Sequence, residues 1–328
     1  MADAAQTSKP TWVQRLRGIL FSQEGILLLI LLGVIIVLAQ QNPNFWTVRN
    51  LLNQGRLMSE VGLVALPMTF IIITAGIDLS VGSILGLSAI VLGVLWKGAG
   101  LPLELAIFLA LIIGSLAGLM NGLFIVKLDV PPLIMTLATL ALYRGLAQGI
   151  SQARSVTGYP EWFFIFGQGR ILGLPTQLWL FIIFTILSII ILRRTTLGRS
   201  LYAIGNNPVG ARFSGLPVGR NLLIIYTYAG FMSALAGVVF VSRVTTTRSD
   251  MGAGLELDVI AAVVLGGTSI FGGKGTVIGT VIGLVLIQLL KNGLALSGVT
   301  SDATIIVIGV VLILAILVNN FIQLKRTS

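Results

Sequence analysis

The stretch IITAGIDLSVGS, residues 72–83, places an aspartate inside one of the most apolar parts of a 328-residue chain. Asp78 is the only ionisable residue between Glu60 and Lys97. A carboxylate that faces lipid costs roughly 2.5–3.5 kcal/mol on insertion scales. The stretch therefore predicts a membrane-embedded region in which a helix is interrupted and Asp78 is held away from lipid.

The composition predicts an all-α integral membrane protein, because 56% of the residues are hydrophobic and only 10% are charged. The polar start MADAAQTSKP lacks the features of a secretory signal peptide. With no cysteine or histidine, the chain has no disulfides, thiolate nucleophiles or imidazole metal ligands. Its net charge of +10 lies in loops between apolar runs, so we expect contact with membrane lipid head groups and not with nucleic acid.

Charges and Pro/Gly clusters divide the chain into ten apolar segments, some of them short or broken. These are residues 19–39, 61–74, 83–96, 103–126, 133–149, 178–192, 222–241, 259–271, 276–290 and 303–318. An even number places both termini on one side, and the loop 193–220, with five arginines and no acid, predicts that this side is cytoplasmic. We expect an N-terminal tail (1–18), one transmembrane domain (19–322) and a C-terminal tail (323–328).

Two regions do not fit simple spans. Residues 61–96 as one helix would be about 54 Å long, against a hydrocarbon core of roughly 30 Å. Residues 259–290 likewise form two short arms around GGTSIFGGKG, residues 266–275. Paired glycine-interrupted segments indicate a transport site, although two ordinary hairpins between tilted helices would give a similar pattern. The residues predicted at these breaks or along a translocation path are Gly76, Asp78, Ser80, Gly82, Ser83, Asn121, Gly266, Gly267, Thr268 and Ser269.

At the first break we expect Asp78 or Ser80 to accept hydrogen bonds from the amides that begin the next helix. Gly76 and Gly82 would allow positive φ angles and close backbone approach. Asp78 is then either a structural cap or a contact for the substrate or gate, and the residues alone leave both open.

The loop after the sixth segment predicts a short helix at residues 208–214. Asn207 can cap it, Pro208 suits its first position, and Gly215 fits a left-handed stop. Arg212 and Phe213 on this helix would dock into a groove of a partner, or the helix would lie on the membrane surface.

Several motifs are absent. Around Gly273-Lys274 a phosphate loop would need glycine at Thr268 and Ser or Thr at Gly275. Ion-coupled carriers usually have ionisable residues facing one another, whereas Asp78 is the only one expected deep in a span, and Arg144 would snorkel from a span end. We therefore expect no enzyme activity and no cofactor, and a path lined by neutral polar groups that would suit an uncharged polyol.

Three stretches, AGIDLSVGS, LGRSLYAIGNNPVGARFSGLPVGR and LELDVIAAVVLGGTSIFGGKGTVIGT, resemble the inner-membrane permease family of bacterial ABC sugar importers. The resemblance is to the ribose, xylose, galactose, rhamnose and autoinducer-2 type and covers residues 20–320. It implies about ten spans, a second permease copy or a paralogous permease, a periplasmic sugar-binding protein, and a cytoplasmic ATP-binding subunit that drives alternating access.

The resemblance also implies roles for particular residues. The loop 193–220 would couple to the ATPase through Asn206, Asn207, Pro208, Ala211, Arg212, Phe213 and Gly215. The second glycine-rich turn would comprise Gly266, Gly267, Gly272, Gly273 and Gly275. The outer segment 150–177, with Tyr159, Trp162, Phe163 and Phe164, would seat the binding protein or lie along the bilayer as an aromatic belt.

The resemblance leaves other readings open. They are a branched-chain amino-acid permease of a related ABC family, a secondary carrier or channel that works without an ATPase, and a scaffold without transport activity. The identity of the sugar, and a homodimer as against a heterodimer, are also open.

Overall fold

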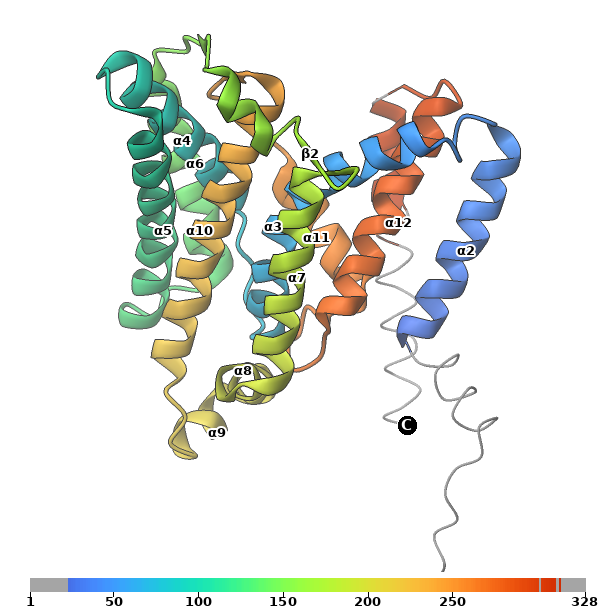
Figure 1. Cartoon of the computed structure of the whole chain (residues 1–328). Coiled ribbons are helices and arrows are strands. Elements are labelled where there is room, and N and C mark those ends of the chain that lie inside the picture. The colour runs from blue at the N-terminus through green and yellow to red at the C-terminus, as the bar shows by residue number, and fades with distance from the viewer. Residues whose placement is uncertain (1–22, 301, 311–312, 314–328) are drawn as a thin grey trace, which may run out of the picture.

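The computed structural model describes residues 23–300, 302–310 and 313 and consists almost entirely of helices (Figure 1). Within this part of the chain, seven helices are long and apolar enough to cross a membrane. They are α3 (Val48–Ile73), α4 (Val81–Gly93) with its π-helical extension (Val94–Gly98), α5 (Leu103–Lys127), α6 (Pro132–Ser151), α7 (Thr176–Arg194), α10 (Val218–Val244) and α12 (Val277–Leu296). The protein is thus a multi-pass membrane protein.

The other helices are shorter or end near the limits of the description. They are α2 (Gln23–Gln41), α8 (Thr196–Asn206), α9 (Pro208–Phe213), α11 (Leu255–Leu265) and a helical stretch at residues 302–310. Both predicted tails, the start of the first predicted span and most of the end of the last one lie outside the described residues. The predicted number of ten spans is therefore not established.

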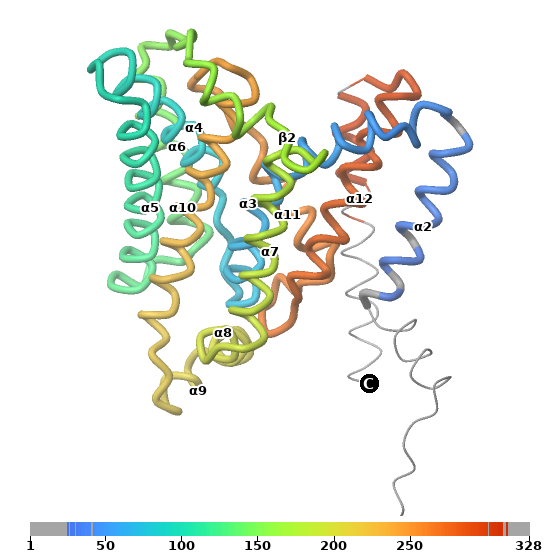
Figure 2. Tube along the Cα trace, in the orientation of Figure 1, coloured from blue at the N-terminus to red at the C-terminus, as the bar shows by residue number. Residues whose placement is uncertain are grey.

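The long helices run between two sides of the bundle, whereas α8 and α9 both lie at one side (Figure 1). The described start of α2 and the short helix α9 lie on the same side (Figures 1 and 2). The loop between α6 and α7 and the loop between α10 and α11 lie on the opposite side (Figure 1). We call these the α9 side and the far side.

On the far side, the segment between α6 and α7 folds into a cap. It contains β1 (Val156–Thr157), paired antiparallel with β4 (Thr246–Thr247), a 3-10 helix (Glu161–Phe166), and the hairpin of β2 (Arg170–Ile171) with β3 (Leu174–Pro175). Tyr159 stacks on Trp96 and packs against Phe163, and burial raises the pKa of Tyr159 to about 12. Tyr159 and Phe163 are therefore the core of the cap and not a surface belt, whereas Trp162 is exposed.

The centre of the bundle is the second half of α3, where every residue from Gly62 to Ile73 is buried. Helix α10 packs along α5 and brings Gly230 against Gly114 and Gly118, so that no side chain separates the two backbones. Such small-residue contacts let membrane helices approach closely and gain dispersion energy.

The prediction that the first interrupted region begins at residue 61 is wrong. Helix α3 starts at Val48, where the Thr47 hydroxyl accepts from the amide of Asn50, and its 26 residues span about 39 Å. The polar residues of its first turns have partners in α12. Asn50 and Asn292 exchange two amide hydrogen bonds of 2.8 and 3.0 Å, and Gln288 donates to Gln54 at 2.7 Å. These bonds let a polar stretch continue the helix.

An ion pair joins α3 to the end of α10. The Arg243 guanidinium donates to both carboxylate oxygens of Glu60, at 2.6 and 3.0 Å, and also lies 4.8 Å from the ring centre of Phe240. The side chain of Glu60 is only 6% exposed. A buried charge of this kind is stabilised mainly by its partner.

We expect Glu60→Leu to lower the free energy of unfolding by about 3 kcal/mol or more, because it leaves the Arg243 charge unpaired. The double variant Glu60→Leu/Arg243→Met should recover most of this loss, since it removes both charges. Thermal unfolding of the purified chain in mild detergent measures both effects. A double variant that is less stable than the single one would contradict the pairing argument.

Candidate functional site

The first break, between α3 and α4, begins with a left-handed turn that closes α3. The amide of Gly76 donates to the carbonyl of Ile71 at 3.0 Å, and that of Ala75 donates to Ile72 at 2.9 Å. These two bonds form a Schellman motif. The residue with positive φ is Ala75, at 62°, and not Gly76 as the sequence suggested.

Gly76 is required for close contact and not for its backbone angle. A Cβ on Gly76 would lie 2.8 Å from the hydroxyl of Tyr226. Gly82 also has no positive φ, because it lies in the first turn of α4, and a Cβ there would collide with the carbonyl of Gly252 and the carboxylate of Glu256. The sequence predicted positive φ angles and close backbone approach for Gly76 and Gly82, and only the close approach is confirmed.

Asp78 is fully buried, but the expectation that Asp78 or Ser80 accepts from the first amides of α4 is wrong, because the N-cap residue Ser80 has no side-chain cap hydrogen bond and Asp78 bonds Ser80 itself. Its Oδ1 accepts from the amide of Ser80 at 2.9 Å and from the hydroxyl of Ser80 at 2.6 Å. Asn121 on α5 donates to the Ser80 hydroxyl at 2.8 Å, and the Tyr143 hydroxyl of α6 lies 3.1 Å from Asn121 Oδ1. The Asp78 cluster, comprising Asp78, Ser80, Asn121 and Tyr143, thus links the break to α5 and α6 through uncharged donors.

Further bonds hold the same region. The hydroxyl of Ser83 donates to the carbonyl of Ser80 at 2.7 Å, and the hydroxyl of Thr136 donates to the carbonyl of Ile77 at 3.1 Å. Among the described residues, Asp78 Oδ2 and the Tyr226 hydroxyl are buried without a hydrogen-bond partner. The break is therefore polar but carries a single carboxylate.

Arg144 does not snorkel to the membrane surface, as the sequence suggested. Its guanidinium donates to the carbonyls of Ser249 at 2.8 Å, Met251 at 2.7 Å and Gly82 at 3.3 Å. These bonds satisfy backbone oxygens of the loop before α11 and fix this loop on α4. A cation that is paired with carbonyls inside the bundle has no need to reach the interface.

The second break follows the 11-residue helix α11 and has the same closing motif. The amide of Thr268 donates to the carbonyl of Val263 at 3.2 Å, and that of Gly267 donates to Val264 at 2.9 Å, with Gly267 at φ 90°. Gly266 lacks a positive φ and instead touches the backbone of Gly279 on α12. Thr268 and Ser269 are buried, and the amide of Ser269 donates to Lys274 at 3.0 Å.

The two breaks meet each other and the end of α8. The amide of Gly273 donates to the carbonyl of Ile73 at 2.8 Å, which joins the second break to the end of α3. Gly205 on α8 packs directly against both of these groups, and the Tyr202 hydroxyl donates to the carbonyl of Gly275 at 2.7 Å. Figure 2 shows the turn after α11 passing beside α8.

We call this contact the junction, and define it as residues 73–76, 202–206 and 272–275. Its three segments each lie within one of the three stretches that stood out in the sequence, residues 72–83, 197–220 and 255–280. Sequence reasoning did not predict that they touch, and it missed α8 altogether. The signal for α8 was available in Thr195, which caps the helix, and in Leu201 and Ile204, which lie on its buried face.

Helix α9 follows α8 directly and has the predicted ends. The Asn207 side chain accepts from the amide of Gly210 at 2.8 Å, and Pro208 is the first helical residue. The amide of Leu216 donates to Ala211 and that of Gly215 to Arg212, with Gly215 at φ 77°. The helix itself ends at Phe213, one residue earlier than predicted.

The outward face of α9 has no partner within the described chain. Phe213 is 89% exposed and Val209 is 61% exposed, and Arg212 is exposed beside them. Asn206, Asn207, Pro208 and Gly215 are also exposed or nearly so, whereas Ala211 is buried against Ile204 and Val218. The predicted coupling residues thus form one protruding surface, which is attached to the junction through α8.

Residues 50–316 match the family model for the permease component of branched-chain amino acid transport systems. The chain is 40% identical over 297 residues to the ribose import permease protein of Escherichia coli (strain K12), and the alignment covers 89% of this chain and 92% of that protein. The corresponding protein of Bacillus subtilis (strain 168) is 43% identical over 290 residues, with 88% and 89% covered. The autoinducer 2 import system permease protein of Yersinia enterocolitica is 40% identical over 272 residues, with 81% and 82% covered.

We expect Gly205→Ala to disrupt the junction, because its Cβ would overlap the Ile73 carbonyl and the Gly273 amide. The loss of the hydrogen bond between these two groups in a buried site costs about 1–3 kcal/mol before steric strain is added. Gly145→Ala is a matched control, since this helical glycine has open space around its Cβ position. The melting temperature in mild detergent should fall for Gly205→Ala and stay level or rise for Gly145→Ala. Equal melting temperatures would rule out a tight junction.

Asp78→Asn should be much milder than Asp78→Leu. Asparagine keeps an oxygen that can accept both bonds from Ser80, whereas leucine leaves the buried Ser80 amide and hydroxyl unsatisfied, at a cost of about 1–3 kcal/mol for each group. The same melting measurement compares the two variants. If both lose the same stability, the negative charge itself, and not the acceptor geometry, stabilises the break.

Proposed function

The chain belongs to the family of transport-system permease components, and from this premise we propose that it is the membrane-spanning subunit of an ATP-driven sugar importer. Its substrate would be a monosaccharide or a related polyol. Support comes from the relatives named as ribose and autoinducer 2 import permeases, which match at about 40% identity over most of both chains. The chemistry of the breaks agrees with this class, because hydroxyls and amides can bond a polyol without an ion pair.

The proposed partners follow from what the chain lacks and from what it exposes. It carries no phosphate loop, so ATP would be hydrolysed by a separate cytoplasmic ATP-binding subunit. Helix α9 would bind that subunit through Phe213 and Arg212, an aromatic anchor and a cation of the kind that commonly dominate interface energies. A periplasmic sugar-binding protein would deliver the substrate, and a second copy or a paralogous permease would complete the path.

The proposed orientation places the α9 side in the cytoplasm and both termini with it, in the bacterial inner membrane. The basic residues of the loop 193–220 support this orientation, since all five of its arginines are exposed. They are Arg193, Arg194, Arg199, Arg212 and Arg220. The far side, with its cap, would then face the periplasm.

The observation that supports this mechanism most strongly is the junction. A movement of α9 acts on α8, and Gly205 of α8 touches the end of α3 and the second break at once. The free energy of ATP binding would therefore reach both interrupted segments through packed backbone, with no flexible side chain between them. Two alternative packings of the junction would give the inward-open and outward-open states of alternating access.

The experiment that tests this function is purification of the chain from its native membrane in mild detergent, with identification of the proteins that accompany it. Recovery of an ATPase with a phosphate loop supports the proposal, and a second permease sequence would show a heterodimer. A chain that is recovered alone and moves solute in liposomes would instead be a carrier or channel. Import of leucine in place of sugars would favour a branched-chain amino-acid permease.

Arg212→Glu should abolish both sugar uptake and capture of the ATPase while leaving the protein folded, because the side chain is exposed. Arg193→Glu is the matched control, as an exposed arginine on the same side but outside α9. Uptake, co-purification and melting temperature are measured together. Loss of uptake in both variants would point to the overall charge of this side and not to α9.

A further inference from the structure

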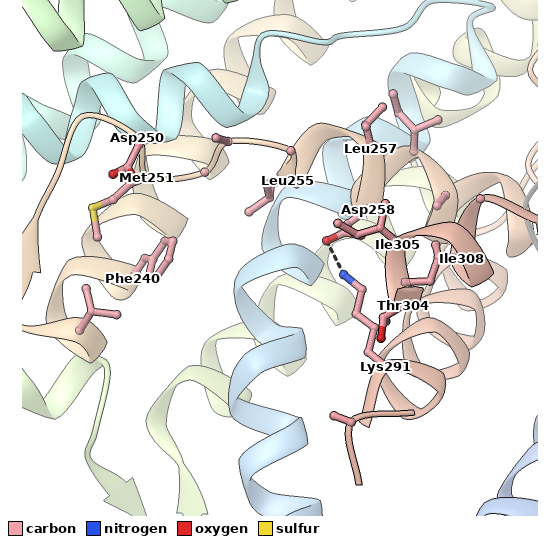
Figure 3. A pocket seen from close by; sticks show the side chains of 18 of the residues that line it. Phe240, Asp250, Met251, Leu255, Leu257, Asp258, Lys291, Thr304, Ile305 and Ile308 are labelled. Atoms are coloured by element: carbon pink, nitrogen blue, oxygen red, sulfur yellow. Dashed lines mark hydrogen bonds and ion pairs between the residues drawn. The ribbon is translucent and has the colours of Figure 1, made fainter. Parts of the chain in front are cut away.

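A large pocket opens on the far side, between the ends of four elements. It has a volume of about 1230 Å³ and is lined by the last turn of α10, the loop before α11, α11 itself, the end of α12, and Thr304, Ile305, Ile308, Gly309 and Ile313 (Figure 3). Small-molecule sites generally occupy about 300–1,000 Å³. The pocket is thus large enough for a sugar and its remaining water, and none of the residues at the two breaks lines it.

Charged side chains in the pocket are paired with opposite charges. Lys291 of α12 donates to Asp258 of α11 at 2.6 Å, and Figure 3 shows this pair on the pocket wall. In the loop before α11, Arg248 donates to Asp250 at 3.0 Å. These four are the charged residues of the described lining, two of each sign, so their formal charges cancel.

The Asp258–Lys291 pair is the polar centre of the pocket. Its side chains are 30% and 31% exposed, so each retains groups that can reach a solute. Charges in this position would be costly if acyl chains filled the pocket, which favours an aqueous or solute-filled space over lipid. Apolar side chains also line the pocket, among them Phe240, Leu255 and Ile305, and they can take the C–H faces of a sugar ring.

Below the pocket, α11 and α12 approach without intervening side chains. Gly266 touches Gly279, and Gly283 touches the carbonyl of Ala262. Helices α11 and α12 are therefore tightly packed between the pocket-lining residues of α11 and the second break.

We propose that this pocket is the entry site for the permeant, and that it binds an uncharged monosaccharide with hydroxyls bonded to Asp258 and Lys291. The assignment rests on the proposed function and on its orientation, in which the far side is periplasmic. A cation or an anion would meet a fixed like charge next to every opposite one. A neutral polyol can donate to the carboxylate and accept from the ammonium at the same time.

The chain contains no cysteine, which makes single-cysteine labelling a direct test. Ala295→Cys places a thiol on an exposed pocket residue, and Ala99→Cys places one on an exposed far-side loop outside the pocket. Both variants are labelled in ATP-free native membranes with a membrane-impermeant maleimide, with and without ribose, xylose, galactose or rhamnose. Both should react, and a sugar at about ten times its Kd should slow labelling about tenfold at Ala295→Cys only.

The ion pair is tested in the same assay by adding Asp258→Asn to Ala295→Cys. Loss of a charge-assisted hydrogen bond should raise the sugar concentration that gives half protection by about tenfold. The partly exposed Lys291 can remain hydrated, so the fold should persist, and the melting temperature checks this. If the sugar concentration for half protection is unchanged by Asp258→Asn, the ion pair is not part of the binding site.

Two results would overturn the proposal. One is a thiol at residue 295 that reacts freely but that no sugar of the panel protects. The other is a thiol at 295 that never reacts while the one at 99 does, which would mean that lipid or a second copy covers the pocket. If either occurs while ATP-dependent sugar import is intact, only the entry site fails. If sugar protects the thiol at residue 295 but the chain moves sugar without an ATPase, the entry site stands and only the ATP-driven function is wrong.

Discussion

Backbone amides and carbonyls freed by a helix break inside a membrane must find partners within the protein, because no bulk water is present. This constraint determines the arrangement of the interrupted segments. Helices α3 and α11 both end in Schellman motifs, which satisfy the last carbonyls locally. Further groups find partners elsewhere in the bundle: the Gly273 amide donates to the Ile73 carbonyl, Thr136 to Ile77 and Tyr202 to Gly275. The breaks are thus completed partly by each other and partly by α6 and α8.

The glycines of the junction follow from the same constraint. Gly205 and Gly76 have ordinary backbone angles, and they are glycines because another backbone or hydroxyl occupies the place of a Cβ. Backbone packed against backbone is stiff, since no rotamer change can absorb a displacement. A short surface helix such as α9 is therefore linked to both breaks through α8, although it lies outside the junction.

The features that the sequence predicted best are those that depend on neighbours in the chain. The ends of α9 were predicted from Asn207, Pro208 and Gly215, because caps and left-handed stops are local devices. The interruption at Asp78 was predicted from the cost of burying one carboxylate. By contrast, the start of α3 was misplaced because Asn50 pairs with Asn292, 242 positions away. Arg144 was misjudged for the same reason, since its partners are carbonyls more than 60 positions away.

The left-handed residue at the end of α3 shows a second limit of sequence reasoning. Glycine is the usual choice there, so Gly76 was the natural expectation, yet Ala75 takes the position. An alanine in this region carries a cost of roughly 1–2 kcal/mol, which the surrounding contacts must offset. The tertiary contact at Gly76, where the Tyr226 hydroxyl excludes a Cβ, decides the register of the turn. Local preference was overridden by packing that only the folded bundle contains.

The distribution of charge within the bundle is relevant to which part of the chain receives the energy for transport. In the described bundle, Glu60 forms an ion pair with Arg243, and Asp258 forms one with Lys291. Asp78 is held by Ser80, and its cluster continues through Asn121 and Tyr143, which are all uncharged donors. The carboxylates of Glu60 and Asp258 thus face cations, whereas the Asp78 carboxylate faces neutral polar groups. This distribution of charge agrees with the proposal that the energy of ATP binding enters at the exposed surface of α9.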